Sequence, residues 1–174
     1  MILLKEIVHK PGLCMQGKTV WRDSVRGIIP HRHDLLMVYS AQTGGYKFPG
    51  GGICNGETHE EALRREIQEE SGAALSEIKR AFGKVIEYDA PIEPDYDVFR
   101  KTSYYYVCRV DDVLGKCRLD AYEEDLGFTP VWIDMDAAIQ ANSLLLQGDR
   151  QEIPQWTMRE LFVLQQVKAQ NAGA

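Results

Sequence analysis

The chain has 174 residues and a formal net charge of −6 at pH 7, with 44% hydrophobic and 26% charged residues. This length and balance fit one globular domain, 1–174. The acidic charge argues against a nucleic-acid-binding surface, which usually carries a basic excess, and no apolar stretch is long enough to span a membrane.

The first elements in chain order read as β-structure. Residues 25–29 and 35–39 are rich in β-branched and large apolar side chains, and the polar stretch 30–34 between them predicts a turn. His31 and His33 lie in that stretch, so we expect turn residues there and not metal ligands. A short alternating strand, 46–48, precedes three consecutive glycines, Gly50 to Gly52.

A helix is expected to follow the glycines. Thr58 with Glu61 three residues later forms a capping-box pattern, and Gly72 is placed to end the helix. Leu63 and Ile67, four residues apart, should face the core. The remaining surface offers acid-first pairs at four-residue spacing, Glu60 with Arg64 and Glu61 with Arg65, which stabilise a helix slightly.

Strands are expected again at 84–88, 104–110 and 129–133, followed by a short helix at 134–141. A second capping-box pattern, Thr157 and Glu160, suggests the start of the last helix. In that helix Leu161, Leu164 and Val167 form an apolar stripe, which we expect to pack on a sheet. Strands interleaved with helices predict an α/β fold with α/β/α layers.

Three acids in the helix expected after the glycines have no basic residue four positions after them to pair with. Glu66, Glu69 and Glu70 lie three and four residues apart, so they share one helix face. At about 5 Å and an effective dielectric of about 20, each pair repels by roughly 3 kcal/mol before screening. A divalent cation would turn that repulsion into attraction, and oxygen ligands favour Mg²⁺ or Mn²⁺. A solvated acidic face is the alternative for the three acids taken alone.

The spacing of these acids resembles a known motif. The segment Gly51 to Ala73 carries all the glycine, arginine and glutamate positions of the Nudix box, namely Gly51, Glu57, Arg65, Glu66, Glu69, Glu70 and Gly72. The chain is therefore identified as a member of the Nudix hydrolase family. The resemblance implies an α/β/α sandwich with a mixed β-sheet.

The resemblance also implies site roles. Glu66, Glu69 and Glu70, with the backbone carbonyl of Gly50, would bind Mg²⁺ or Mn²⁺, and Arg65 would orient the glutamates by pairing with Glu57. The catalytic base would be Glu69 or an acid on a loop between late strands. In the stretch 111–125 the candidates are Glu123 and Glu124, for which a solvated acidic loop is the alternative.

The implied reaction is hydrolysis of a pyrophosphate bond in a nucleoside diphosphate linked to another group. Nucleoside triphosphates, ADP-ribose-like compounds and dinucleoside polyphosphates all remain open as substrates. The alternatives are a non-catalytic nucleotide sensor of the same fold and an enzyme like isopentenyl-diphosphate isomerase. Five aromatic residues are candidates for stacking on a base, although core packing is the competing explanation for each: Trp21, Phe48, Tyr88, Tyr104 and Tyr106.

The remaining expectations concern the cell and the partners. The N-terminus becomes charged too early for a signal peptide, and the four cysteines are too far apart for a zinc site. We therefore expect a cytoplasmic protein with reduced thiols, a nucleotide-type small molecule as its partner, neither nucleic acid nor membrane, and a possible homodimer.

Overall fold

The computed structural model of the protein describes residues 1–111, 115–148 and 153–172. Its strands are β1 (Leu3–Val8), β2 (Thr19–Ile28), β3 (Pro30–His31), β4 (Asp34–Ser40), β5 (Tyr46–Lys47), β6 (Leu75–Asp89), β7 (Val98–Val110) and β8 (Phe128–Asp134). Its helices are α1 (His59–Ser71), α2 (Ala121–Asp125), α3 (Met135–Leu145) and α4 (Trp156–Ala172).

The strands form two sheets. In the larger one the order is β1-β6-β7-β2, where β6 and β7 pair antiparallel and the two outer strands each pair parallel with their neighbour. In the smaller one β4 pairs along its whole length with β8, while β3 and β5 pair with its two ends. The predicted mixed sheet is confirmed.

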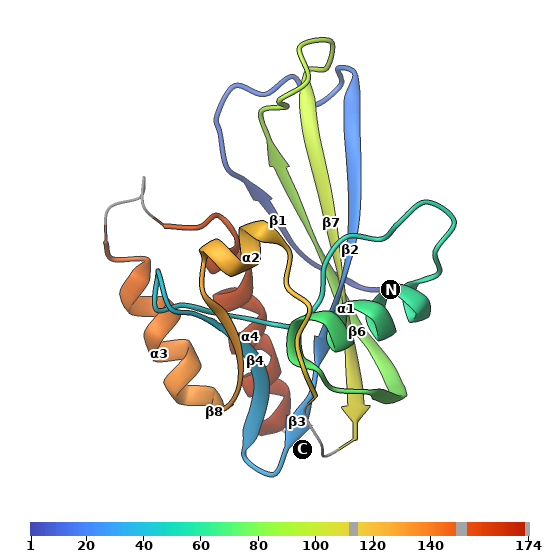
Figure 1. The fold of residues 1–174 in the computed structure, drawn as a ribbon. Coiled ribbons are helices and arrows are strands. Elements are labelled where there is room, and N and C mark those ends of the chain that lie inside the picture. Colours follow the sequence, from blue (N-terminus) through green and yellow to red (C-terminus); the bar gives the residue numbers. More distant parts are fainter. Residues whose placement is uncertain (112–114, 149–152, 173–174) are drawn as a thin grey trace.

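Helices cover both faces of this β-structure, with α1 on the opposite side from α3 and α4 (Figure 1). Each side has its own core, because successive residues of a strand point to opposite faces. Leu36 of β4 packs with Leu63 and Ile67 of α1, whereas Leu35 and Met37 pack with α3 and α4. The expected α/β/α layering and the core positions of Leu63 and Ile67 are confirmed.

The segment after β5 joins the two sheets. It runs beside β2, where the Val25 amide donates to Gly51 O (3.0 Å) and the Gly27 amide donates to Pro49 O (2.8 Å). Further along, the Ile53 amide donates to Asp23 O (3.0 Å). The start of the box is therefore fixed at the edge of the larger sheet before α1 begins.

Both ends of α1 match the prediction. Thr58 is the N-cap and forms a reciprocal capping box with Glu61, and Gly72 ends the helix in the left-handed conformation at φ 67°. The pair Glu60–Arg64 is present at 3.1 Å. The predicted pair Glu61–Arg65 is wrong, because Glu61 is used by the cap and Arg65 binds other acids.

Other predictions were too short or wrong. The strands expected at 84–88 and 104–110 are only the C-terminal parts of the longer strands β6 and β7, and the helix expected at 134–141 continues to Leu145. The capping box at Thr157 is wrong: α4 already includes Trp156, and the Glu160 carboxylate instead accepts from the Phe48 amide (3.2 Å). In the stripe, Leu164 and Val167 are buried and Leu161 is only half-buried.

The described cysteines are all unpaired, as expected for reduced thiols. None of the helices in the described ranges is long and apolar enough to cross a membrane.

Candidate active site

Two of the three box glutamates, Glu66 and Glu70, lie about one helical turn apart on α1 with little solvent exposure. The side chain of Glu70 is 1% exposed and that of Glu66 is 12% exposed. Both line a pocket of about 520 Å³ between the box helix and the larger sheet. Burial raises the pKa of Glu66, since a charged carboxylate loses hydration there.

Glu70 is held from two directions. The Lys47 ammonium donates to its Oε1 (2.5 Å), and the Gly50 amide donates to its Oε2 (2.8 Å). Lys47 comes from β5 and Gly50 from the segment after it, so the strand that leads into the box also positions the carboxylate. The same ammonium lies 3.9 Å from Glu123 Oε1.

The glycines are needed because two groups approach them closely. At Gly50, φ is 137° and an added Cβ would lie 2.1 Å from Val25 O. At Gly51, an added Cβ would lie 2.2 Å from the Glu66 carboxylate. A side chain at either position would displace the segment or the glutamate, which is why glycine is required at both.

Arg65 organises the outer side of the box. Its Nε and Nη2 each donate to one oxygen of Glu57 at 2.8 Å, so the pair is bidentate as expected. Its Nη1 donates to Glu66 (2.7 Å) and to Glu69 (3.1 Å). The hydrogen bond from Arg65 lowers the pKa of Glu57 to about 2. The geometry agrees with an orienting role for Arg65, which stays a prediction.

Glu123 and Glu124 both lie in α2, which directs their side chains to different environments. Asp120 caps this short helix, with reciprocal bonds between Asp120 and Glu123, and so directs Glu123 into the pocket. Burial, together with a hydrogen bond and the charge of Glu70, raises the pKa of Glu123 to about 7. Glu124, the next residue, is exposed and does not line the pocket. Geometry therefore favours Glu123 of the two candidates.

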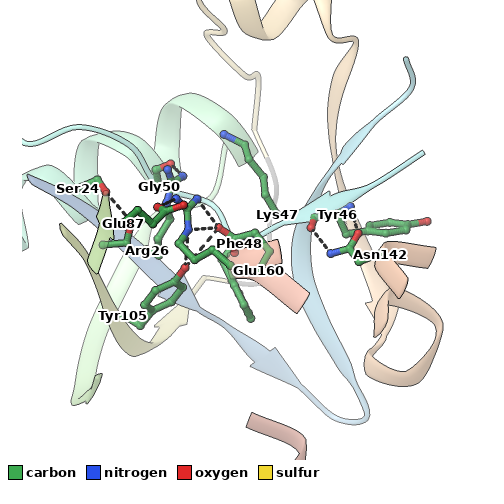
Figure 2. A network of polar contacts seen from close by, with 12 residues as sticks. Ser24, Arg26, Tyr46, Lys47, Phe48, Gly50, Glu87, Tyr105, Asn142 and Glu160 are labelled. Atoms are coloured by element: carbon green, nitrogen blue, oxygen red, sulfur yellow. Dashed lines mark hydrogen bonds and ion pairs between the residues drawn. The ribbon is translucent and has the colours of Figure 1, made fainter. Parts of the chain in front are cut away.

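Two other predicted ligands lie less favourably. Glu69 is 39% exposed, pairs with Arg65 and does not line the pocket. Gly50 lines the pocket, but its carbonyl accepts a hydrogen bond from the Arg26 guanidinium (Figure 2). The structure thus brings together Glu66, Glu70 and Glu123, and leaves Glu69 outside that group.

Opposite the acids, the pocket has a basic wall that the motif did not reveal. It consists of Arg22 and Arg26 on β2, Lys101 on β7 and Arg159 on α4. These residues lie far apart in the chain and follow no local spacing. The alternation of Arg22, Ser24 and Arg26 along a strand is the one sequence signal that would have placed the β2 residues on a common face.

Arg159 belongs to a buried ionic network next to this wall. Its guanidinium donates to Glu87, to Glu160 (Nη2, 2.7 Å) and to the Tyr105 hydroxyl (3.0 Å). Burial alone would raise the pKa of Glu87, but the charge of Arg159 and a hydrogen bond from His9 lower it to about 2. Figure 2 shows Glu87, Tyr105 and Glu160 around this network.

The carboxylates at the pocket suit a hard divalent cation. Glu66, Glu70 and Glu123 offer oxygen donors on one side of the pocket, and the Lys47 ammonium already supplies positive charge between two of them. In the described part of the chain, no three His, Cys, Asp or Glu side chains stand close enough to form a metal site without rearrangement.

The aromatic candidates for base stacking lie elsewhere. Phe48 is completely buried in the core, and Tyr104 and Tyr106 pack around His59 at the start of α1. Trp21 is exposed and stacks on Arg100. The aromatic residues that line this pocket are Tyr122, Phe128 and Trp156.

Comparisons with known proteins agree with this geometry. A family model described as "NUDIX domain" matches residues 21–157. An RNA pyrophosphohydrolase from Sulfurovum sp. is 31% identical over 118 residues, which are 63% of this chain and 74% of the relative. Another from Helicobacter pylori is 38% identical over 97 residues, and there the match spans 50% of this chain but only 63% of the relative.

Solved structures show the same fold. A NUDIX hydrolase from Nitrosomonas europaea superposes with a TM-score of 0.54 at 18% identity, covering 74% of this chain and 85% of that one. A MutT protein from Bacillus halodurans superposes with a TM-score of 0.52 at 16% identity, covering 69% and 72%.

Proposed function

The chain belongs to the Nudix family and is a hydrolase of nucleotide-linked pyrophosphate bonds, and we propose that it works with Mg²⁺ or Mn²⁺ in the pocket between α1 and the larger sheet. Members of the family generally use divalent metal ions. The observation that carries the proposal is the pair Glu66 and Glu70, with side chains 12% and 1% exposed, on one wall of a pocket whose other wall is basic.

In this proposal Glu66 and Glu70 hold the metal, with Gly50 O as a further donor once Arg26 turns to the substrate. The metal, when bound, would stabilise negative charge on the phosphoryl oxygens and acidify a bound water. Arg65 keeps Glu66 and Glu57 in place through its five hydrogen bonds to Glu57, Glu66, Glu69 and Gly52 O.

Glu123 is our candidate for the base. Its carboxylate lies on the pocket wall beside Glu70, where it can accept the proton of the attacking water at Oε1. Glu69 and Glu124 are the weaker candidates because neither lines the pocket. Breaking the anhydride leaves negative charge on the departing phosphate, which the basic wall faces.

The substrate is proposed to be a nucleotide with a phosphate chain at its 5′ end, either free or at the end of an RNA. The relatives named RNA pyrophosphohydrolases favour the RNA end, and this stands in tension with our expectation of no nucleic acid. The net charge of −6 favours the free nucleotide. Neither the sensor nor the isomerase alternative is favoured by an observation in the pocket. That the chain is one domain, cytoplasmic, and possibly a dimer stays a prediction.

A substrate panel tests the proposal. Purified protein is given a 5′-triphosphate RNA oligonucleotide, nucleoside triphosphates, a dinucleoside tetraphosphate and ADP-ribose, with Mg²⁺, Mn²⁺ or EDTA, and released phosphate and pyrophosphate are measured. We expect metal-dependent cleavage of one class, lost in EDTA. If no member is cleaved with either metal, the proposed function is wrong.

A further inference from the structure

We infer that Arg22, Arg26 and Lys101, here called the basic triad, form the subsite that binds the phosphate chain of the substrate, and that Lys101 sets the affinity for that chain. The inference rests on the proposed function, because it assigns a substrate contact within the same pocket. It concerns side chains that no motif of the box contains.

Strand register brings the triad together. Arg22 and Lys101 are direct cross-strand partners in the parallel pairing of β2 with β7, and Arg26 lies four residues further along the same face of β2. Directly opposed like charges destabilise a sheet. Burial and the charges of Arg159, Arg26 and Arg22 all lower the pKa of Lys101, which reports the same repulsion. The fold therefore tolerates a charge arrangement that its own stability does not favour.

The triad differs from the other cations of the pocket in having no acid of its own. Lys47 is paired with Glu70, and Arg159 with Glu87 and Glu160. Among the described residues, no carboxylate lies within ion-pair distance of any triad member, and Arg26 Nε has no hydrogen-bond partner although Arg26 is only 6% exposed. A buried guanidinium with an unused donor is costly unless a ligand supplies the acceptor.

A structural role for Lys101 is the competing explanation. Glu87 is its cross-strand neighbour on β6 and attracts it. However, Glu87 is already engaged, since one of its oxygens bonds to His9 (3.0 Å) and the other to Arg159. Among the described residues, Lys101 is thus left without a carboxylate of its own at the junction of the main pocket and a neighbouring pocket of about 330 Å³, both of which it lines.

The triad matches the chemistry of a phosphate chain. Its members run from exposed Arg22, which lies over Gly52, to buried Arg26, which touches Gly50, so they follow the box segment from the mouth of the pocket inward. Successive phosphate groups present acceptor oxygens at intervals along such a path, and arginine and lysine are the usual donors to them. Two guanidinium groups, with a lysine amine whose protonated form a bound phosphate would favour, suit a substrate with several consecutive phosphates.

The test compares Lys101→Met with Lys101→Arg and with a control, Lys84→Met. Lys84 lies on β6 in register with Tyr104, which is three positions from Lys101 on β7 and so points to the opposite face of the sheet. Lys84 does not line the pocket. The dissociation constant of inorganic tripolyphosphate is measured by calorimetry in EDTA at low salt. KM and kcat are measured on the substrate that the panel identifies, and melting temperature is measured for each variant.

We expect Lys101→Met to raise both the tripolyphosphate dissociation constant and KM about tenfold to a hundredfold, with kcat and melting temperature near wild type. Lys101→Arg should restore most of the affinity, and Lys84→Met should match wild type. Unchanged tripolyphosphate affinity in Lys101→Met, or a fall in melting temperature with no change in affinity, would overturn the inference. Absence of turnover in the wild type would overturn the proposed function instead, because tripolyphosphate binding is read without turnover.

Discussion

The two walls of the pocket are built in different ways. The acidic wall comes almost entirely from one continuous stretch, the segment from Lys47 through α1, with Glu123 added by α2. The basic wall combines β2, β7 and α4, whose residues are separated by up to 137 positions, from Arg22 to Arg159. Local spacing along a helix sets the first wall, whereas strand register and helix docking set the second.

The two walls also differ in the chemical role for which their side chains are suited. The acidic wall holds its carboxylates with backbone and Lys47 contacts, as a site for metal and proton transfer requires. The basic wall includes three side chains, Arg22, Arg26 and Lys101, that have no carboxylate within ion-pair distance among the described residues, as a site for an anionic ligand requires. Variants of the first wall should mainly change kcat, and variants of the second should mainly change KM or stability.

The largest effect is expected from Glu70→Gln. Losing one metal-binding carboxylate should lower kcat by about a thousandfold or more, equivalent to roughly 4 kcal/mol. Since Lys47 would lose its closest partner, we also expect a melting temperature several degrees lower, so kcat is measured well below it, with circular dichroism to verify the fold.

Glu69→Gln is the matched control on the same helix. Because Glu69 is partly exposed and its side chain contacts only Arg65 among the described residues, we expect less than about a tenfold loss. If both variants lose activity equally, Glu69 belongs to the acidic wall, contrary to its position outside the pocket.

A smaller effect is expected when the pH is lowered, because this protonates Glu87 in the ionic network around Arg159. The pKa of Glu87 is lower in the folded protein (about 2) than in the unfolded chain (4.5), so its stabilising contribution is complete above the unfolded value and is lost as the pH falls towards 2. This contribution is about 3 kcal/mol.

Urea unfolding measured between pH 6 and pH 3 checks this contribution. Wild type should lose more stability over that interval than Glu87→Gln, which lacks the titrating carboxylate. Equal pH slopes in the two proteins would mean that Arg159 is held by Glu160 alone.

The smallest effect is expected from Glu60→Gln, which removes an exposed pair with Arg64 on the solvent side of α1. Such pairs are worth a few tenths of a kcal/mol, so stability should fall by no more than about 0.5 kcal/mol and activity should not change. A loss of activity here would show that the acidic wall extends beyond the pocket-facing side of α1.

The sequence was most informative where neighbouring residues decide the structure. The capping box at Thr58, the end of α1 at Gly72 and the buried side of that helix all follow from short spacings. The length of the β6–β7 pair did not follow, because polar residues such as Lys79 and Arg80 lie in its exposed part and hide the strand. The capping box expected at Thr157 failed because tertiary contacts recruited Glu160 to Phe48 and Arg159.

The same distinction applies to the site. Glu66, Glu70 and the pair Arg65–Glu57 were predictable from the box, whose residues are close in sequence. The choice between Glu123 and Glu124 needed α2, which directs adjacent residues to different environments. Lys101 was not predictable, since its place beside Arg22 depends on pairing between strands whose ends lie about 80 positions apart in the chain.

The hydrogen bonds between the box segment and β2 offer a way to observe the pocket directly. The Val25 and Gly27 amides donate to Gly51 O and Pro49 O, so their protection from deuterium exchange depends on whether that segment stays seated against the strand. Both amides are backbone groups outside the catalytic carboxylates and the basic triad. The exchange rates of these two amides therefore report how often the box segment detaches from β2, and they can be measured in the protein without substrate.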